Sequence, residues 1–158
     1  MNPSVYIETT IPSFFCEVRT EPDMVARREW TREWWHDHLP DCDVFTSEAV
    51  IEELGSGSFP RKASALELVS ELPLLDINEA VADTVATYIS NHVMPNDPAG
   101  DALHLAVASV HKCDFLLTWN CRHLANANKF GHIRRINTLL GLFVPAIVTP
   151  LELLGEKP

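Results

Sequence analysis

Short apolar runs alternate with longer amphipathic stretches along the whole chain. The short runs are rich in β-branched and aromatic residues, which is typical of buried strands. They occupy residues 4–8, 44–46, 74–77, 115–119 and 146–148. The stretches between them place apolar residues at the period of an α-helix. Since strand and helix periods keep exchanging, we expect an α/β fold in which helices cover both faces of a parallel sheet.

The helical stretches carry start and stop signals. Predicted helices cover residues 24–39, 47–55 or 47–57, 60–70 and 79–92, then a helix from residue 97, two short helices within 122–141 and a terminal helix from residue 149. Asp97 and Pro98 supply an N-cap and a first helical residue. We expect Gly131 to break the 122–141 segment into two helices.

Two local signals add a cap and a turn. Thr149 and Glu152 have the spacing of a capping box, with Pro150 at the first helical position. Pro12 predicts a turn over residues 9–13, directly after the first strand.

Three tryptophans, Trp30, Trp34 and Trp35, lie at near-helical spacing in the 24–39 helix. We expect them to pack on the core, because buried aromatic side chains contribute large apolar areas. An alternative is that part of this aromatic face is exposed and binds a partner or a second copy of the chain.

The length and composition predict one globular domain over residues 1–158. No apolar run approaches the roughly 18 residues of a membrane span, and the N-terminus lacks the basic-then-apolar order of a secretory leader. The four cysteines are scattered without a C-x-x-C pair, so we expect buried free thiols. Together these features predict a cytoplasmic protein.

The net charge is −10, from 12 basic and 22 acidic residues. Such an acidic chain argues against nucleic-acid binding over a broad basic surface. A polyanionic substrate would have to be held locally, by metal ions, by a second subunit or by short basic clusters. Two such clusters occur, Arg27 with Arg28 and Arg32, and Arg134 with Arg135.

Four polar residues stand where predicted strands end or helices begin. Glu8 ends the first strand, and Asn120 follows the fourth apolar run. Glu53 lies in the helix after the second strand, and Asp101 lies in the first turn of a later helix. Ligands of parallel α/β sheets bind outside the carboxyl ends of the strands, so we expect these side chains to converge there.

Three carboxylates and an amide oxygen suit Mg2+ or Mn2+ as ligands. Such an ion activates water and neutralises charge on a phosphoryl oxygen, so the pattern predicts phosphodiester hydrolysis without a covalent nucleophile. Any one of these residues alone would more often be solvated or cap a helix, and only the joint pattern carries the prediction. Glu52, next to Glu53, points about 100° away around the helix and is expected to face solvent.

Several short motifs, taken in order, resemble the PIN-domain family and, within it, the VapC-like toxins of bacterial toxin–antitoxin pairs. They are residues 5–13 (VYIETTIPS), 50–54 (VIEEL) with Gly57 after them, 100–106 (GDALHLA) and 117–124 (LTWNCRHL). The similarity continues to residues 149–153 (TPLEL) and so covers nearly the whole chain.

The resemblance implies a three-layer α/β/α sandwich around a central parallel sheet, with a Mg2+- or Mn2+-dependent site that cuts single-stranded RNA. It also implies frequent dimerisation, so a homodimer is one expected form of the chain. If the chain is the toxin of a type II pair, a small antitoxin is expected to cover the acidic crevice and to place an arginine on its carboxylates.

The site residues carry over position by position from the resemblance. Glu8 stands at the family's first Asp and Glu53 at its Glu. Asp101 stands at the central Asp, Asn120 where many members have another Asp, and Thr118 at the Ser or Thr beside the site. Two departures follow: Glu8 is one methylene longer than Asp and must retract or shift the ion, and Asn120 removes a negative charge, which should weaken metal binding.

Four further residues are candidates for substrate contacts or for support of the metal ligands. They are Thr9, Thr118, His104 and Arg122. His104 lies one turn after Asp101 and either faces the pocket or is a hydrogen-bonded structural histidine. Arg122 either contacts substrate phosphate or has a solvated or packing role at a helix start.

The first hypothesis is therefore a metal-dependent endoribonuclease in which Glu8, Glu53, Asp101 and Asn120 hold one or two ions. A second hypothesis is a metal-poor PIN-like module that binds RNA or a protein partner without catalysis. A third is a phosphatase or other hydrolase that uses the same crevice on small phosphate esters.

Overall fold

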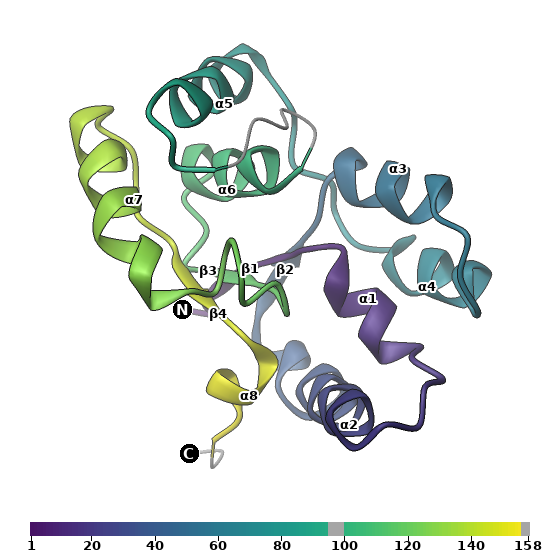
Figure 1. Ribbon diagram of the computed structural model, residues 1–158. Helices are drawn as coiled ribbons and strands as arrows, with labels where there is room; N and C mark the ends of the chain where they lie inside the picture. The colour runs from purple at the N-terminus through teal and green to yellow at the C-terminus, as the bar shows by residue number, and fades with distance from the viewer. Residues whose placement is uncertain (95–99, 156–158) are drawn as a thin grey trace.

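A four-stranded parallel sheet forms the centre of the molecule (Figure 1). The computed structural model describes residues 1–94 and 100–155. Strand β1 (Ser4–Ile7) lies between β2 (Asp43–Phe45) and β3 (Phe115–Leu117), and β4 (Ala146–Val148) pairs with β3. The order β2-β1-β3-β4 makes β1 and β3, which lead into Glu8 and Asn120, direct neighbours.

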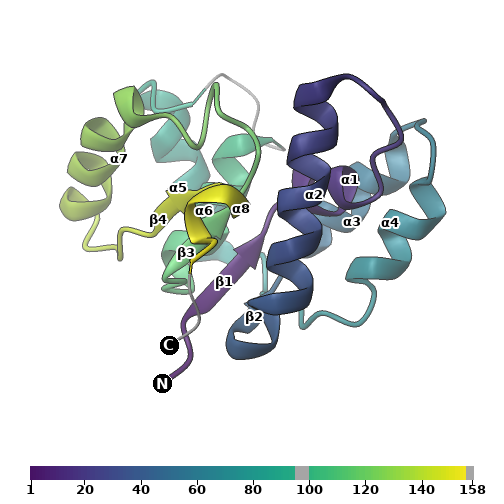
Figure 2. The same ribbon diagram turned by 90° about the horizontal axis from the view of Figure 1, so that it is seen from below.

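Helices cover both faces of this sheet. In the described residues they are α1 (Thr10–Phe15), α2 (Pro22–Asp37), the 3-10 turn η1 (Leu39–Asp41), α3 (Glu48–Ser56), α4 (Lys62–Val69), α5 (Glu79–Ser90), α6 (Asp101–Val110), α7 (Ala127–Leu139) and α8 (Pro150–Leu153). Helices α2 and α8 lie on one side of the sheet, and α5 and α6 lie on the other (Figures 1 and 2). This arrangement confirms the predicted three-layer α/β/α sandwich with a central parallel sheet.

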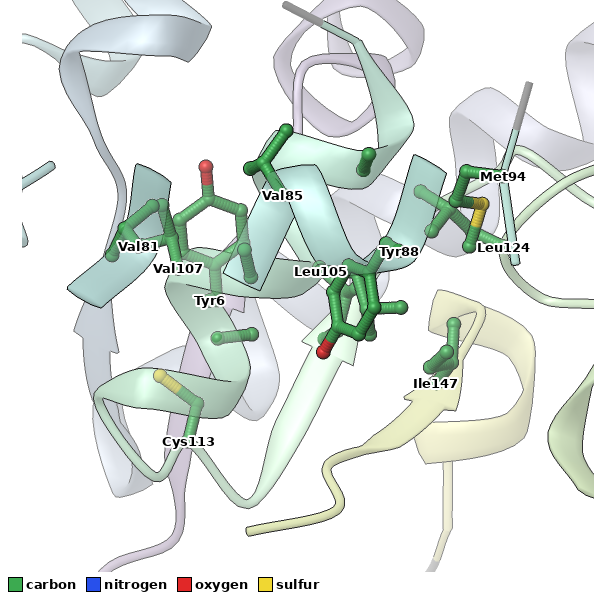
Figure 3. Packing of buried hydrophobic residues seen from close by; sticks show 14 of the residues in the cluster. Tyr6, Val81, Val85, Tyr88, Met94, Leu105, Val107, Cys113, Leu124 and Ile147 are labelled. Atoms are coloured by element: carbon green, nitrogen blue, oxygen red, sulfur yellow. The ribbon is translucent and has the colours of Figure 1, made fainter. Parts of the chain in front are cut away.

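The alternation of side chains along β1 feeds two separate cores. Val5, Tyr6 and Ile7 are all fully buried. Tyr6 points into the core built with α5 and α6, which Figure 3 shows from close by. Val5 and Ile7 point into the opposite core, which includes Trp34 of α2. Burial on both faces explains why this strand reads as an almost continuous apolar run.

The tryptophan-bearing helix is α2, and its main role is in the core. Trp34 is 1% exposed, which confirms core packing for this residue. Trp30 and Trp35 are half-buried and pack against the same core. Trp30 also stacks on Trp119, with ring centroids 6.1 Å apart. A partner on the remaining exposed part of this face stays a prediction.

Two segments differ from the prediction. The turn expected over residues 9–13 is instead the start of α1, with Pro12 as its third residue. Proline is tolerated there, because N–H groups in the first helical turn have no intrahelical acceptor. The strand expected over residues 74–77 is a single bridge between Thr46 and Leu74. Leu74 is 48% exposed and Ile77 43%, so burial does not hold this run in the sheet.

The expected break near Gly131 is wrong, because α7 continues through this residue from Ala127 to Leu139. Glycine inside a helix costs only about 1 kcal/mol. Burial of Ile133 and Ile136 on the inner face of α7 offsets this cost.

The remaining local signals agree with the structure where it describes them. The capping box at Thr149 and Glu152 is present at the start of α8. The helix start predicted at Asp97 and Pro98 lies outside the described residues, and α6 begins at Asp101.

All four cysteines are free, as expected, but they are not uniformly buried. Cys113 is buried, whereas Cys121 is exposed because it lies in a surface turn after β3. Across residues 1–94 and 100–155, none of the helices combines the length and apolar character needed to cross a bilayer.

Candidate metal site

Parallel pairing brings the ends of β1 and β3 to one edge of the sheet. The N–H of Glu8 donates to the carbonyl of Leu117 at 3.2 Å, and the N–H of Thr118 donates to the carbonyl of Val148 at 3.0 Å. Glu8 and residues 118–120 therefore leave the sheet side by side. This is the strand end at which ligands of parallel α/β folds bind.

Glu8 is 3% exposed, and one of its two carboxylate oxygens is fixed. Oε1 accepts hydrogen bonds from the backbone N–H of Thr10 at 2.9 Å, from the hydroxyl of Thr118 at 2.8 Å and from the hydroxyl of Thr10. Oε2 accepts no hydrogen bond from the described residues. One oxygen thus orients the side chain while the other remains available as a ligand.

Glu53 reaches the same place from α3 and is held by two side chains. Its Oε2 accepts a hydrogen bond from the hydroxyl of Thr9 at 2.8 Å. Its Oε1 lies 2.6 Å from Nε2 of His104, which is 1% exposed. Glu52 is exposed, as the helical geometry predicts.

His104 is anchored on its other side by a buried polar chain. Nδ1 of His104 lies 2.7 Å from the hydroxyl of Tyr6, which in turn lies 2.7 Å from the hydroxyl of Ser47. With both ring nitrogens protonated, Nε2–H donates to Glu53 and Nδ1–H donates to Tyr6, whose O–H donates to Ser47. His104 therefore fulfils both expectations: it faces the site, and it is a fully hydrogen-bonded histidine.

Asp101 and Asn120 form a second pair beside this cluster. Nδ2 of Asn120 lies 3.0 Å from each carboxylate oxygen of Asp101. Oδ1 of Asn120 accepts the backbone N–H groups of Arg122 at 3.2 Å and His123 at 3.0 Å. The amide of Asn120 therefore donates to Asp101, and its oxygen is engaged by the turn that follows β3.

The charges of the site act on one another's pKa values. Burial raises the pKa of the Glu8 and Asp101 carboxyls, and the charge of His104 offsets only part of this effect. Burial would also raise the pKa of Glu53, but the hydrogen bond and charge of His104 outweigh it, and the pKa is lowered. Burial would lower the pKa of His104, but Glu53 and the other nearby carboxylates outweigh it, and the pKa is raised. The Glu53–His104 contact is thus an ion pair.

The residues predicted from the sequence lie at one edge of the sheet, but they form two groups and not a single cluster of four ligands. One carboxylate oxygen each of Glu8 and Glu53 and one ring nitrogen of His104 lie within 4.8 Å of one another. Asp101 is not part of that group of three, although its pKa responds to the charges of Glu53 and His104. Arg122 is exposed, and only its backbone N–H contacts the site.

This donor set fits a divalent cation. Two carboxylates are within ligand distance of a common point, and one Glu8 oxygen has no hydrogen bond to occupy it among residues 1–94 and 100–155. Carboxylate oxygens suit both Mg2+ and Mn2+. The protonated imidazole of His104 donates from both ring nitrogens and therefore positions Glu53 without binding the ion itself. Both ions are therefore compatible with these residues.

Sequence reasoning missed three residues that orient the ligands. Thr10 supplies two of the three hydrogen bonds to Glu8, and Tyr6 and Ser47 hold His104. A signal for Tyr6 was present, because a tyrosine in a buried strand needs a partner for its hydroxyl. The pairing of that hydroxyl with a histidine 98 residues away has no local signature.

Asn120→Asp is expected to destabilise the metal-free protein. The substitution removes the hydrogen bond to Asp101 and places two carboxylates in contact, which should cost about 1–3 kcal/mol and lower Tm by roughly 2–10 °C. Thermal unfolding in EDTA and in Mn2+ tests this prediction. Mn2+ should reduce the Tm difference between wild type and Asn120→Asp, because the new carboxylate adds a metal ligand. Asn128→Asp, at an exposed position in the first turn of α7, is the matched control. Equal Tm values for wild type and Asn120→Asp in EDTA would contradict the assigned amide orientation.

Comparison with known proteins agrees with this architecture. A family model described as PIN domain matches residues 20–128. The matched range includes Glu53, Asp101 and Asn120, and Glu8 lies before it. No curated protein sequence matches the chain.

Two solved structures share the fold at low sequence identity. The crystal structure of VapBC2 from Rickettsia felis, bound to a DNA fragment from its promoter, matches with a TM-score of 0.59 and 14% identity, over 92% of this chain and 98% of that one. The crystal structure of FitAcB from Neisseria gonorrhoeae matches with a TM-score of 0.54 and 16% identity, over 94% of this chain and 99% of that one.

Proposed function

The chain belongs to the PIN-domain family, and from that premise we propose that it is a Mg2+- or Mn2+-dependent endoribonuclease that acts as the toxin of a type II toxin–antitoxin pair. The observation that carries the proposal is the meeting of Glu8, Glu53 and His104 within 4.8 Å at the strand ends, beside Asp101. Glu8 after β1, Glu53 of α3 and Asp101 of α6 meet at one partly buried edge. Stability does not explain this arrangement, because burial opposes ionisation of Glu8 and Asp101.

When bound, the ion would lower the pKa of a coordinated water and neutralise charge on the phosphoryl oxygen. Glu8, with Oε1 fixed and Oε2 free, and Glu53 would hold it. His104 keeps Glu53 in position through its own bond to Tyr6. Asn120 orients the Asp101 carboxylate toward the same edge. No serine or cysteine nucleophile is needed in this scheme.

Several finer parts of the proposal rest on the family resemblance. We propose single-stranded RNA as the substrate, a small antitoxin that covers the acidic edge, and a homodimer. The likeness to VapBC2 and FitAcB supports the fold on which these proposals rest. A cytoplasmic location and a single domain over residues 1–158 belong to the same proposal.

A second candidate function is supported by the hydrogen bonds themselves. His104 already neutralises Glu53, and the amide of Asn120 already satisfies Asp101. With these contacts in place, a PIN-like module that binds RNA or a protein partner without catalysis would need no metal ion to compensate the two carboxylates. Calorimetric titration with Mn2+ separates the two functions: tight binding that is lost in Glu8→Ala excludes the metal-poor module.

Cleavage of single-stranded RNA by the purified chain in Mg2+ or Mn2+, with EDTA as the negative condition, tests the nuclease proposal. Glu53→Gln should reduce cleavage by roughly 10³-fold, since a lost metal ligand is worth several kcal/mol. Glu52→Gln is the matched control, because it removes the same charge from the exposed side of α3. Equal loss in both variants would point away from a specific site at Glu53.

The same assay distinguishes the nuclease from the third hypothesis, a phosphatase or other hydrolase that acts on small phosphate esters. A simple phosphomonoester should be turned over far more slowly than RNA. Faster turnover of the phosphomonoester would instead identify a small-ester phosphatase.

A further inference from the structure

A pocket of about 460 Å³ lies at the end of α1 that is remote from Glu8. Arg28 and Arg32 of α2 line one side of this pocket, and Arg61 and Ser64 at the start of α4 line another. Figure 1 shows α1 running from the end of β1 into the space between α2 and α4. The pocket therefore combines basic residues from two segments that are about 30 residues apart in the chain.

The guanidinium groups keep much of their hydrogen-bonding capacity free. Nε of Arg32 donates to the carbonyl of Phe15 at 2.8 Å, and Nη1 of Arg28 donates to the carbonyl of Glu17 at 3.3 Å. Each guanidinium has five N–H donors in a planar fork, so these contacts orient the group and leave donors for an anion.

Acidic side chains neutralise this cluster only in part. Within residues 1–94 and 100–155, no carboxylate lies within 4.0 Å of Arg32 or Arg61. Arg28 is paired with Glu29 at 3.0 Å. Glu17, the acidic residue of the pocket, is paired with the exposed Arg19.

Arg32 and Arg61 both lie close enough to Cys16 for their charges to act on its thiol. Burial raises the pKa of the Cys16 thiol, and the positive charges of Arg32 and Arg61 both act against that rise. Arg61 also has a left-handed backbone with φ of 65°, which is uncommon for a residue other than glycine. Two unpaired positive charges therefore face one pocket in a chain whose net charge is −10.

The pocket and the metal site lie at opposite ends of α1, at a separation that a nucleic-acid strand can span. Thr9, immediately before α1, contacts Glu53, and Phe15 ends the same helix at the pocket. Six helical residues span about 9 Å at 1.5 Å per residue. A single strand whose bases stay stacked at the helical rise of about 3.4 Å per nucleotide would cover this distance with two or three nucleotides.

We propose that Arg28, Arg32 and Arg61 bind a backbone phosphate of the RNA strand two or three nucleotides from the bond that is cut. This subsite rests on the proposed nuclease function and deepens it. Phosphate contacts fix the register of a strand without reading its bases. The pocket would thus supply the local positive charge that an acidic nuclease needs for a polyanionic substrate.

Binding of fluorescent single-stranded RNA to the Asp101→Asn variant, which should not cut it, tests the subsite. Adding Arg61→Gln or Arg32→Gln to this variant should weaken binding about tenfold. It should also lower the slope of log affinity against log salt by about 0.7, the value for one lost phosphate contact on a single strand. Arg135→Gln, exposed on α7 and outside the pocket, is the charge-matched control.

Cleavage kinetics in the otherwise wild-type chain separate the subsite from the function. Arg61→Gln should raise KM for a ten-nucleotide RNA about tenfold with little change in kcat, whereas Arg135→Gln should leave KM unchanged. Wild-type affinity and KM in both Arg32→Gln and Arg61→Gln would overturn the subsite while RNA cleavage itself persists. Preferential binding of a short polyglutamate peptide at these arginines would also overturn it, in favour of an acidic protein segment. If the wild-type chain neither binds nor cuts RNA, the result overturns the proposed nuclease function itself, and the subsite with it.

Discussion

Asp101→Asn should abolish RNA cleavage, with a loss on the order of 10³-fold or more in kcat. The substitution removes one negative charge next to the Glu8, Glu53 and His104 cluster, and a carboxylate at a metal site contributes several kcal/mol to catalysis. The amide that replaces it keeps an oxygen for the hydrogen bond from Asn120. The fold should therefore be intact, and circular dichroism and Tm should match those of the wild type.

Asp83→Asn is the matched control for this experiment. Asp83 is exposed on α5, and removal of its charge should leave cleavage unchanged. Undiminished cleavage by Asp101→Asn, at a normal dependence on Mn2+, would remove Asp101 from the catalytic site. Loss of cleavage together with a large fall in Tm would indicate a structural role instead.

Glu8→Gln should stabilise the metal-free protein while removing its response to metal. Because burial raises the pKa of Glu8 in the folded chain, folding favours the protonated form. Stability from this group is complete below the unfolded pKa of about 4.3 and is lost as the pH rises through the higher folded pKa. Above this folded pKa the ionised Glu8 therefore costs stability, and a neutral glutamine does not.

Because the variant carries no buried charge, its Tm in EDTA should exceed that of the wild type at the upper end of the pH range. The glutamine oxygen can still accept the hydrogen bonds from Thr10 and Thr118, so the local structure should persist. Thermal unfolding in EDTA from pH 4 to pH 8 should show wild type and variant diverging as pH rises. In Mn2+, Tm should rise for the wild type and change little for Glu8→Gln.

Glu71→Gln is a suitable control, since Glu71 is exposed between α4 and the strand-like bridge at Leu74. It should follow the wild type under every condition. A wild-type Tm that stays above that of Glu8→Gln across this pH range in EDTA would show that ionised Glu8 is stabilising, contrary to the direction of its pKa.

Much of the architecture follows from local sequence patterns. The apolar runs at β1, β2, β3 and β4 and the helical periods between them are enough to predict a parallel sheet covered on both faces. A strand that is buried on both faces needs a continuous apolar run. A helix that is buried on one face has apolar residues at the helical period. The errors occurred where the prediction gave a single glycine or proline more weight than its surroundings. Helix α7 continues through Gly131, and α1 contains Pro12.

The sequence also predicted which side chains would meet: Glu8 and Glu53 lie close together in the structure, and Asn120 contacts Asp101. Their role as a metal site stays a prediction. Their positions depend on strand ends and helix starts, which are local features. The sequence by itself did not determine what each side chain does there. Asn120 presents its amide N–H₂ group to Asp101, and this orientation depends on a turn that engages its oxygen.

Only the tertiary structure decided the contacts between distant segments. His104 meets Glu53 across 51 residues and Tyr6 across 98, and Arg61 joins Arg28 and Arg32 at the end of α1. Such contacts depend on how helices pack on the sheet, and packing is set by the whole core and not by nearby residues. The chain therefore encodes its elements locally, whereas the partners of its charged side chains are fixed only once the sheet and both helical layers have come together.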